Sequence, residues 1–545
     1  MGRQHPVGRG ARAERVRDQG FALVAVIVTI AVLSLFLLTA LAYTLNGMAP
    51  ARRGQDAKTA EQAAQAGVDE YIARLNADDN YWKRGSVDPD NAAFTSTGQP
   101  IQGTGGAAST AARYTYSVLS TSEETTAKGI IRIRVTGSSG RFASAGTVTR
   151  TVTAELKRAG VLNYVYLTDY EVVDPDLTGQ SSNCGRYYYA TSDSLARPRS
   201  GCSEIQWGGN DTVNGPLHSN DALQINGQVN FTETKTETSW PATQGAAKGT
   251  KTWWGTQAAP LSPNPPRWAA TVSLPASNNE LLKSVQPDVD GDGDVGPGCY
   301  YKGATRVVLQ GTTMKVLSPS TTDSDIPSRC YDVTRPGVEQ TVTVPPVIYV
   351  DSSTASCTIG TVGYPAANER YTVGSTTAAA WNSSTNYACT RGTVFVSGTA
   401  ATQVTVAASD DVVVVGDLQP DANGGTNVIG LIAGNCVWVY HPLRANTSNN
   451  LYTTSPVNTI QAAILALRHS FVVQNWASGS PLGTLNVYGA IAQKFRGPVG
   501  TGSGANIATG FVKNYVYDTR LKYTQPPYFL NAANAPFQIL QVTDG

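Results

Sequence analysis

The stretch FALVAVIVTIAVLSLFLLTALAYTL, residues 21–45, decides how the N-terminal part of this chain folds. It runs for 25 residues without a charged side chain. A helix rises about 1.5 Å per residue, so a run of this length crosses the roughly 30 Å hydrocarbon core of a bilayer with some tilt. The sequence therefore predicts a membrane-spanning helix.

The residues before this run set its orientation. Residues 1–20, MGRQHPVGRGARAERVRDQG, carry five arginines against one glutamate and one aspartate. Because the basic side of a membrane helix stays cytoplasmic, everything after residue 46 is predicted to face outward. A plain signal-anchor and a secretory signal peptide are the alternatives, although the apolar core of a signal peptide is normally only about 7–15 residues long.

The helical pattern continues beyond the apolar run. Residues 51–76, ARRGQDAKTAEQAAQAGVDEYIARLN, place small and apolar side chains at helical spacing and polar ones between them. We therefore expect one long helix over residues 21–76, apolar in its first half and amphipathic in its second. The stripe of small residues allows close approach by other helices or by a sheet.

Together these features resemble the N-terminus of type IV pilins, and of PilX-type minor pilins in particular. The resemblance is carried by a basic leader (residues 1–20) ending in Gly20, by Phe21 opening the apolar helix, and by AEQAAQAGVDEYIARL at residues 60–75. In that family a prepilin peptidase cuts after the glycine and the new N-terminal residue is methylated. The resemblance therefore implies cleavage between Gly20 and Phe21.

One position departs from the family pattern. Major pilins carry a glutamate at the fifth mature position, which is Ala25 here. The resemblance then implies a minor, structural or adhesive subunit of a type IV pilus or related filament, with other pilin subunits, the assembly machinery and the prepilin peptidase as partners. It also implies a single-pass protein of the bacterial cell envelope with its C-terminus outside, found in a surface filament after processing.

Residues 77–160 complete this first module. The segments 113–119, 129–138 and 148–159 alternate apolar and polar side chains, as half-buried strands do. Three antiparallel strands laid on an amphipathic helix would form the head of a pilin-like unit. We place the boundary of this module near Gly160.

Residues 161–545 are predicted to form a large, mainly β head, which makes the whole chain α+β. Charged residues are only 15%, against about 25% in ordinary globular proteins, and there are 53 glycines. A short apolar motif with a central glycine recurs near residues 223–229, 412–418 and 485–491, which suits the stacked rungs of a parallel β-helix-like solenoid. The alternative is a β-sandwich. Residues 460–468, IQAAILALR, are the one segment expected to be helical.

The seven cysteines all lie in the part predicted to face outward, where disulfides persist. Sequential pairing is the lowest-loop hypothesis, although the sequence does not fix the connectivity. It joins Cys184 to Cys202, Cys299 to Cys330, and Cys357 to Cys389. Cys436 lies in an apolar segment and is interpreted as a buried free thiol.

A candidate calcium loop lies at residues 287–298, PDVDGDGDVGPG. Carboxylates at positions one, three and five with a glycine at six match the first half of an EF-hand-type loop, although Cys299 stands where that loop has its glutamate. We expect Ca²⁺ there, and a solvated acidic turn is the alternative. The ligands would be Asp288, Asp290, Asp292 and Asp294.

Enzymatic activity is not expected, and the rival hypothesis is a membrane-anchored extracellular β-helix carbohydrate-active enzyme. Asp410 and Asp411 resemble the paired carboxylates of β-helix galacturonases, but the Gly-His-Gly and Arg-x-Lys elements of those enzymes are missing. A net charge of +1 disfavours nucleic acid as a partner. A surface or glycan ligand is the open alternative, because four tryptophans within residues 233–270 could stack on sugar rings or simply pin a long loop.

Overall fold

The computed structural model describes fifteen stretches of the chain. They are residues 18–78, 80–84, 91–101, 112–139, 147–158, 160–189, 194–208, 211–239, 253–255, 264–286, 296–371, 387–421, 425–503, 506–533 and 535–545. The chain divides into two compact units. The first comprises Met1–Val118, Ile133–Ala154 and Val542–Gly545, and the second comprises Leu119–Arg132 and Glu155–Gln541.

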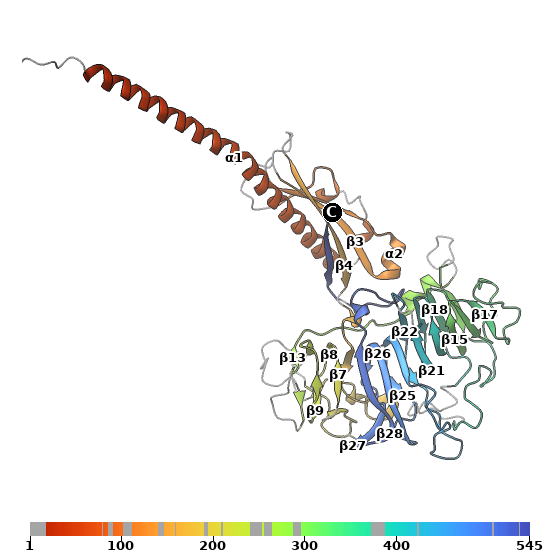
Figure 1. Cartoon of the computed structure of the whole chain (residues 1–545). Coiled ribbons are helices and arrows are strands. Elements are labelled where there is room, and N and C mark those ends of the chain that lie inside the picture. Colours follow the sequence, from red (N-terminus) through yellow and green to blue (C-terminus); the bar gives the residue numbers. More distant parts are fainter. Residues whose placement is uncertain are drawn as a thin grey trace, which may run out of the picture. The chain divides into compact units, whose positions relative to one another are not determined.

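The first unit is built on one long helix and a small sheet (Figure 1). Helix α1 runs from Asp18 to Ala77, which confirms the long helix predicted over residues 21–76 and begins three residues earlier. The sheet has the strand order β1-β2-β3-β4-β29. Its strands are β1 (Gln99–Pro100), β2 (Arg113–Val118), β3 (Ile130–Ser139), β4 (Val148–Arg158) and β29 (Phe537–Asp544). The three strands predicted by alternation are therefore present.

Strand β29 corrects the predicted domain boundaries. The sequence pattern assigns residues 161–545 wholly to the head, but the C-terminal strand lies beside β4 at the edge of the small sheet. Its last residues, Val542–Gly545, belong to the first unit, whereas Leu119–Arg132, which includes α2 (Ser122–Lys128), belongs to the second. The alternation in β29 is too weakly apolar to indicate a sheet partner more than 380 residues earlier.

The second unit is dominated by parallel strands stacked in ladders. The longest ladder has the spatial order β14-β18-β20-β22-β24-β26-β5-β8-β11-β13, and every neighbouring pair in it is parallel. These strands are β14 (Cys299–Lys302), β18 (Val347–Asp351), β20 (Val404–Ala408), β22 (Ile429–Ala433), β24 (Thr459–Ala466), β26 (Pro481–Phe495), β5 (Tyr166–Tyr170), β8 (Leu217–Ser219), β11 (Thr236–Thr238) and β13 (Arg267–Trp268).

The order of this ladder is a circular permutation of the chain order. The first strand of the unit, β5, lies in the middle of the stack against β26, which comes late in the chain. The chain therefore builds the rungs from β5 to β13, passes to the far end at β14, and returns rung by rung until β26 closes on β5. Two runs of consecutive rungs thus meet at the β26–β5 pair.

Shorter parallel ladders form the other sides of the rungs. One runs β15-β19-β21-β23-β25, and another joins β26 through β28 to β7 and β10. A third, β6-β9-β12, forms a separate sheet. Their bounds are β15 (Thr305–Gly311), β19 (Val394–Ala400), β21 (Val412–Pro420), β23 (Val437–Val439), β25 (Phe471–Val473), β28 (Asn506–Tyr517), β7 (Thr212–Asn214), β10 (Asn230–Phe231), β6 (Gln206–Gly208), β9 (Leu223–Asn226) and β12 (Trp253–Trp254).

The remaining short elements complete the second unit. Strands β16 and β17 extend β15 by antiparallel pairing, and β27 pairs antiparallel with β28. Their bounds, with those of the short helices of both units, are β16 (Thr313–Leu317), β17 (Gln340–Thr343), β27 (Gly500–Ser503), α3 (Pro175–Thr178), η1 (Tyr81–Arg84), η2 (Ala92–Phe94), η3 (Val161–Asn163), η4 (Ser182–Cys184), η5 (Asn279–Ser284) and η6 (Thr519–Lys522).

This pairing agrees with the β-helix-like prediction and departs from the sandwich alternative, whose sheets are antiparallel. The central strands are near-continuous apolar runs because they are covered on both faces, as parallel strands usually are. Strand β20 is buried along its whole length, and so is β22. The segment that follows η6 packs against these strands, because the Thr405 hydroxyl donates to the Pro527 carbonyl at 2.5 Å and Phe529 lies beside Gly430.

The helix expected at residues 460–468 is wrong, because this segment forms strand β24. Its Ala and Leu side chains have high helix propensity, but propensity is a weak prior that tertiary packing overrides. Parallel hydrogen bonding to β22 on one side and to β26 on the other satisfies its backbone. Small alanines also fit the crowded interior between two rungs.

Candidate functional site

The most exposed apolar surface of the described chain is the first half of α1. Residues Ala22–Tyr43 have a mean hydropathy of 2.8, and none of this window is buried within the described structure. Its large side chains point outward all around the helix, with Leu35, Phe36 and Leu37 among the most exposed. Water strongly disfavours a bare apolar surface of this size, so an apolar environment must cover it in the cell.

The geometry of this segment suits such an environment. At about 1.5 Å per residue its 22 residues span about 33 Å, which matches a bilayer core. Its two threonine hydroxyls are satisfied within the helix, because Thr29 donates to the Ala25 carbonyl at 2.8 Å and Thr39 donates to the Leu35 carbonyl at 2.9 Å. Lipid offers no hydrogen-bond partners, so this internal satisfaction removes a large cost of burial.

The second half of α1 is held against the sheet by close contact. Ala60, Ala64 and Val68 are completely buried. Gly137 of β3 lies so near the helix that an added Cβ would stand 1.9 Å from the Ala60 carbonyl oxygen. The predicted small-residue stripe is therefore used, on this side of the helix, for packing on the strand.

A polar cluster fixes the same half of the helix. The Tyr116 hydroxyl donates to the Glu70 carboxylate at 3.0 Å and lies 3.0 Å from the Tyr81 hydroxyl. Asn91 donates to the Tyr81 hydroxyl at 2.8 Å. Burial raises the pKa of the neighbouring Tyr71 well above its ordinary value, with a further contribution from Tyr81. The second half of α1 is thus fixed on the sheet, whereas the apolar first half is exposed.

The predicted processing residues lie within this helix. Gly20 and Phe21 belong to the helical backbone of α1, and Ala25 is exposed on its apolar half. No carboxylate replaces the missing family glutamate there, since Ala22–Tyr43 carries no acidic side chain. The leader residues 1–17 lie outside the described part of the chain.

The cysteines are arranged as the sequential pairing predicts. Disulfides join Cys184 to Cys202, Cys299 to Cys330, and Cys357 to Cys389. Cys436 is a buried free thiol, and burial raises its pKa well above the ordinary value, with the Asp411 carboxylate adding to the effect. A protonated, inaccessible thiol is chemically inert.

The predicted calcium ligands lie outside the described residues. Asp288, Asp290, Asp292 and Asp294 all fall within 287–295. Elsewhere, Asp174, Asp176 and His469 place three ligand atoms within 4.8 Å of one another. The Asp174 carboxylate there already accepts from the Asp176 amide at 2.9 Å, capping α3, and from His469 Nδ1 at 2.6 Å.

The paired carboxylates of the enzyme hypothesis form hydrogen bonds and ion pairs within the second unit. Asp411 is buried and accepts from the Cys436 amide at 3.1 Å and from the Trp438 indole at 3.2 Å. Asp410 accepts from the Ser352 hydroxyl and the Gly392 amide, both at 3.0 Å. Both carboxylates pair with Arg391. Through these contacts the two carboxylates join neighbouring rungs.

The described tryptophans of residues 233–270 contact the body of the second unit. Trp254 stacks on Tyr188 with ring centroids 4.0 Å apart, and Trp253 packs partly buried against the core. Trp268 belongs to β13, and Trp240 lies outside the described residues. Of the two interpretations, pinning of the segment is the one that these contacts support.

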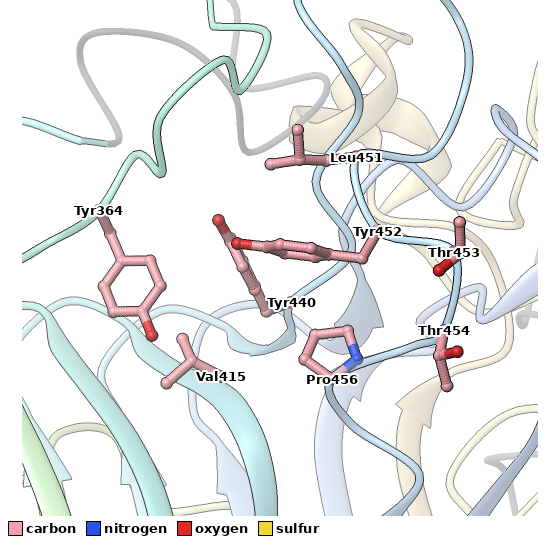
Figure 2. A pocket seen from close by; sticks show the side chains of 8 residues that line it. All are labelled: Tyr364, Val415, Tyr440, Leu451, Tyr452, Thr453, Thr454 and Pro456. Atoms are coloured by element: carbon pink, nitrogen blue, oxygen red, sulfur yellow. The ribbon is translucent and has the colours of Figure 1, made fainter.

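A tyrosine-lined cleft, which the sequence did not indicate, opens on the second unit (Figure 2). Its volume is about 440 Å³. Tyr364 and Tyr440 lie edge to face with centroids 5.2 Å apart, and the ring of Tyr452 faces the same hollow. The lining residues are Tyr364, Val415, Tyr440, Leu451, Tyr452, Thr453, Thr454 and Pro456.

A buried carboxylate holds the floor of this cleft. Glu369 accepts from the Tyr440 hydroxyl at 2.5 Å and from the Gln474 amide at 3.2 Å, and it also accepts from Tyr387. Burial raises the pKa of Glu369, although these hydrogen bonds oppose the rise. The tyrosines come from loops after β18, β23 and before β24, so no local motif brings them together.

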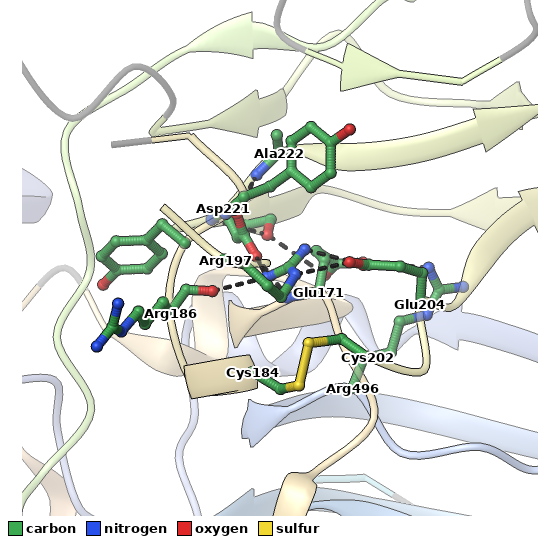
Figure 3. A network of polar contacts seen from close by, with 12 residues as sticks. Glu171, Cys184, Arg186, Arg197, Cys202, Glu204, Asp221, Ala222 and Arg496 are labelled. Atoms are coloured by element: carbon green, nitrogen blue, oxygen red, sulfur yellow. Dashed lines mark hydrogen bonds and ion pairs between the residues drawn. A yellow bond between two sulfur atoms is a disulfide. The ribbon is translucent and has the colours of Figure 1, made fainter. Parts of the chain in front are cut away.

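A second unforeseen feature is a buried charge cluster at the junction of β26 and β5 (Figure 3). Arg197 is fully buried and pairs with Glu204 at 2.8 Å and with Asp221 at 2.6 Å. Arg496 pairs with Glu171 at 3.1 Å. Each charge has an opposite partner, which is what burial of charge requires, so the cluster is structural.

The sequence matches no family model and no curated protein. Among solved structures, the chain matches the crystal structure of the competence-associated pilin ComZ from Thermus thermophilus with 12% sequence identity and a TM-score of 0.27, over 90% of this chain and 97% of that chain. A TM-score below 0.5 does not establish a shared fold.

Proposed function

We propose that this protein is a minor, PilX-like subunit of a type IV pilus or a related surface filament. One observation carries the proposal: α1 presents a fully exposed apolar half, Ala22–Tyr43, continuous with a half that is fixed on a small sheet. The apolar half of such a helix can lie in the membrane before assembly and among the apolar helices of other pilin subunits afterwards.

The proposal extends to orientation and display. The basic leader favours a cytoplasmic N-terminus, which puts the second unit outside the cell. Three disulfides agree with an oxidising compartment. The second unit would then be an adhesive head without enzymatic activity. Supporting this, Asp410 and Asp411, the best catalytic candidates of the sequence, are engaged in structural hydrogen bonds.

The N-terminus of the mature protein tests this proposal. Co-expression with a prepilin peptidase should give a chain that begins at N-methyl-Phe21, as measured by mass spectrometry of the N-terminal peptide. Gly20→Val should leave an uncut precursor because a branched side chain replaces the glycine at the scissile bond. Gly10→Val, in the same leader, is the control and should be cut normally. Surface filaments containing the intact Met1–Gly20 segment would overturn the proposal.

A further inference from the structure

The tyrosine-lined cleft has the surface chemistry of a ligand site. Its volume of about 440 Å³ falls in the range of about 300–1,000 Å³ that small-molecule sites occupy. Tyr452 is 42% exposed although its ring faces the hollow. The Tyr440 hydroxyl donates to the buried Glu369 carboxylate, and this hydrogen bond orients the Tyr440 ring in the cleft.

The hydroxyl groups around the cleft are available. Among the described residues, the side-chain hydroxyls of four lining residues have no protein hydrogen-bond partner. They are Tyr364, Tyr452, Thr453 and Thr454. By contrast, the Tyr440 hydroxyl already donates a hydrogen bond to Glu369. The rim thus offers several donors and acceptors, while the centre offers ring faces.

The lining also lacks charge. None of its eight residues is acidic or basic. The nearby Arg306 is already paired with Glu339 at 2.7 Å. A polyanion such as nucleic acid gains its affinity from lysine and arginine contacts with phosphate, and this cleft supplies none. Its surface instead complements a neutral molecule with many hydroxyl groups and a face of C–H bonds.

We infer that this cleft binds a neutral carbohydrate, with one sugar ring stacked on Tyr452. The C–H face of a pyranose places weakly positive hydrogens against the negative face of the aromatic ring. The threonine and tyrosine hydroxyls at the rim would exchange hydrogen bonds with the sugar hydroxyls. This inference deepens the proposed adhesive role by naming the partner class, and it rests on that role only for the exposure of the head outside the cell.

Binding is measured on the purified full chain, in a zwitterionic detergent that has no sugar head group. The probes are fluorescently labelled hexasaccharides of β-glucose, α-glucose, galactose and N-acetylglucosamine, followed by fluorescence anisotropy. A heparin hexasaccharide and a single-stranded oligonucleotide are the acidic comparators. Since processing and assembly play no part in this measurement, its failure is distinct from failure of the filament proposal.

We expect at least one neutral probe to bind. Tyr452→Ala should weaken that binding about tenfold, whereas Tyr452→Phe, which keeps the ring, should largely retain it. Tyr488→Ala is the matched control, because Tyr488 is 41% exposed on β26 and does not line the cleft. It should bind like the wild type.

Three results would overturn the inference. The first is that no neutral probe binds at millimolar concentration. The second is that binding is unchanged in Tyr452→Ala, or is lost equally in Tyr452→Phe, since either result excludes stacking on this ring. The third is that only the acidic probes bind, with an affinity that falls steeply with salt, which would reassign the surface to a polyanion.

Discussion

His469 and Asp174 form a partly buried pair whose charge state connects stability to pH. Burial is the largest single effect and acts to lower the pKa of His469, but the hydrogen bond to Asp174 and the charges of the nearby carboxylates together outweigh it, so the pKa is raised. The carboxylates of Asp411 and Asp176 act in the same direction. A raised pKa in the folded state means that the stabilising contribution is fully present below the ordinary histidine value of about 6.5. It is lost as the pH rises through the folded pKa.

The wild type should therefore lose stability between about pH 6.5 and the folded pKa of His469, and we predict that His469→Gln shows no such loss. The measurement is the urea midpoint of wild type and variant at several pH values. His441 is the control of opposite sign, because burial lowers its pKa and its contribution is lost as the pH falls. Parallel pH curves for wild type and His469→Gln would contradict the prediction.

Cys436 gives a second prediction at the residue scale. Because the thiol is buried and its pKa is raised, iodoacetamide should leave it unmodified in the folded protein and label it in urea. Non-reducing peptide mapping should recover the other six cysteines as three disulfide-linked pairs. Labelling of Cys436 at the same rate in buffer and in urea would show that the thiol is not protected.

At the scale of an element, Gly137 decides how closely α1 can lie on β3. A Cβ at this position would stand 1.9 Å from the Ala60 carbonyl and 2.5 Å from the Ala64 amide nitrogen. We predict that Gly137→Val forces the helix away from β3 and lowers the free energy of unfolding by at least about 1–3 kcal/mol, as overpacking typically does. Increased hydrogen exchange of amides 60–75 would report the loosened helix.

Gly54 supplies the control within the same helix. A Cβ added there meets no atom within 4 Å. Gly54→Ala should therefore stabilise the helix by about 1 kcal/mol, which is the propensity difference between the two residues. If Gly137→Val left exchange over residues 60–75 as slow as in the wild type, the close contact would not govern the packing of α1.

The same element shows where sequence reasoning works. Composition and length are sufficient to predict α1, and period-two alternation is sufficient to predict β2, β3 and β4, because each signal is local in the sequence. The segment at 459–466 misleads because its alanines favour a helix locally and only its neighbours β22 and β26 make it a strand. The cleft escapes prediction because Tyr364, Tyr440 and Tyr452 meet only in three dimensions.

At the scale of the whole molecule, the least predictable feature is the order of the rungs. A glycine-punctuated repeat indicates stacking, but it does not say which rung lies next to which. Strand β26 could equally have ended the stack, yet it pairs with β5, and Ile491 lies opposite Tyr166. No local signal connects residues so far apart, so only the three-dimensional structure reveals the closure.

The Arg496–Glu171 pair is the polar lock of that closure. Its partners are 325 residues apart in sequence, and the side chains are 3% and 0% exposed. Arg496 also stacks over Trp207 at 3.9 Å and donates to the Ile205 carbonyl at 3.2 Å. Removing the arginine would leave a buried carboxylate without its counter-charge, which is costlier than losing the pair itself.

We accordingly predict that Arg496→Met destabilises the second unit by about 3–5 kcal/mol, and that adding Glu171→Gln recovers part of this loss because the buried charge is then gone. Urea unfolding followed by tryptophan fluorescence gives both values, and hydrogen exchange at β5 and β26 locates the opening at their shared edge. Arg306→Met, at the more exposed pair with Glu339, is the control and should cost no more than about 1 kcal/mol. Equal losses of stability for the two arginine variants would show that the closure depends on backbone pairing and apolar packing alone. The same would follow if the double variant were less stable than Arg496→Met by the full cost of Glu171→Gln.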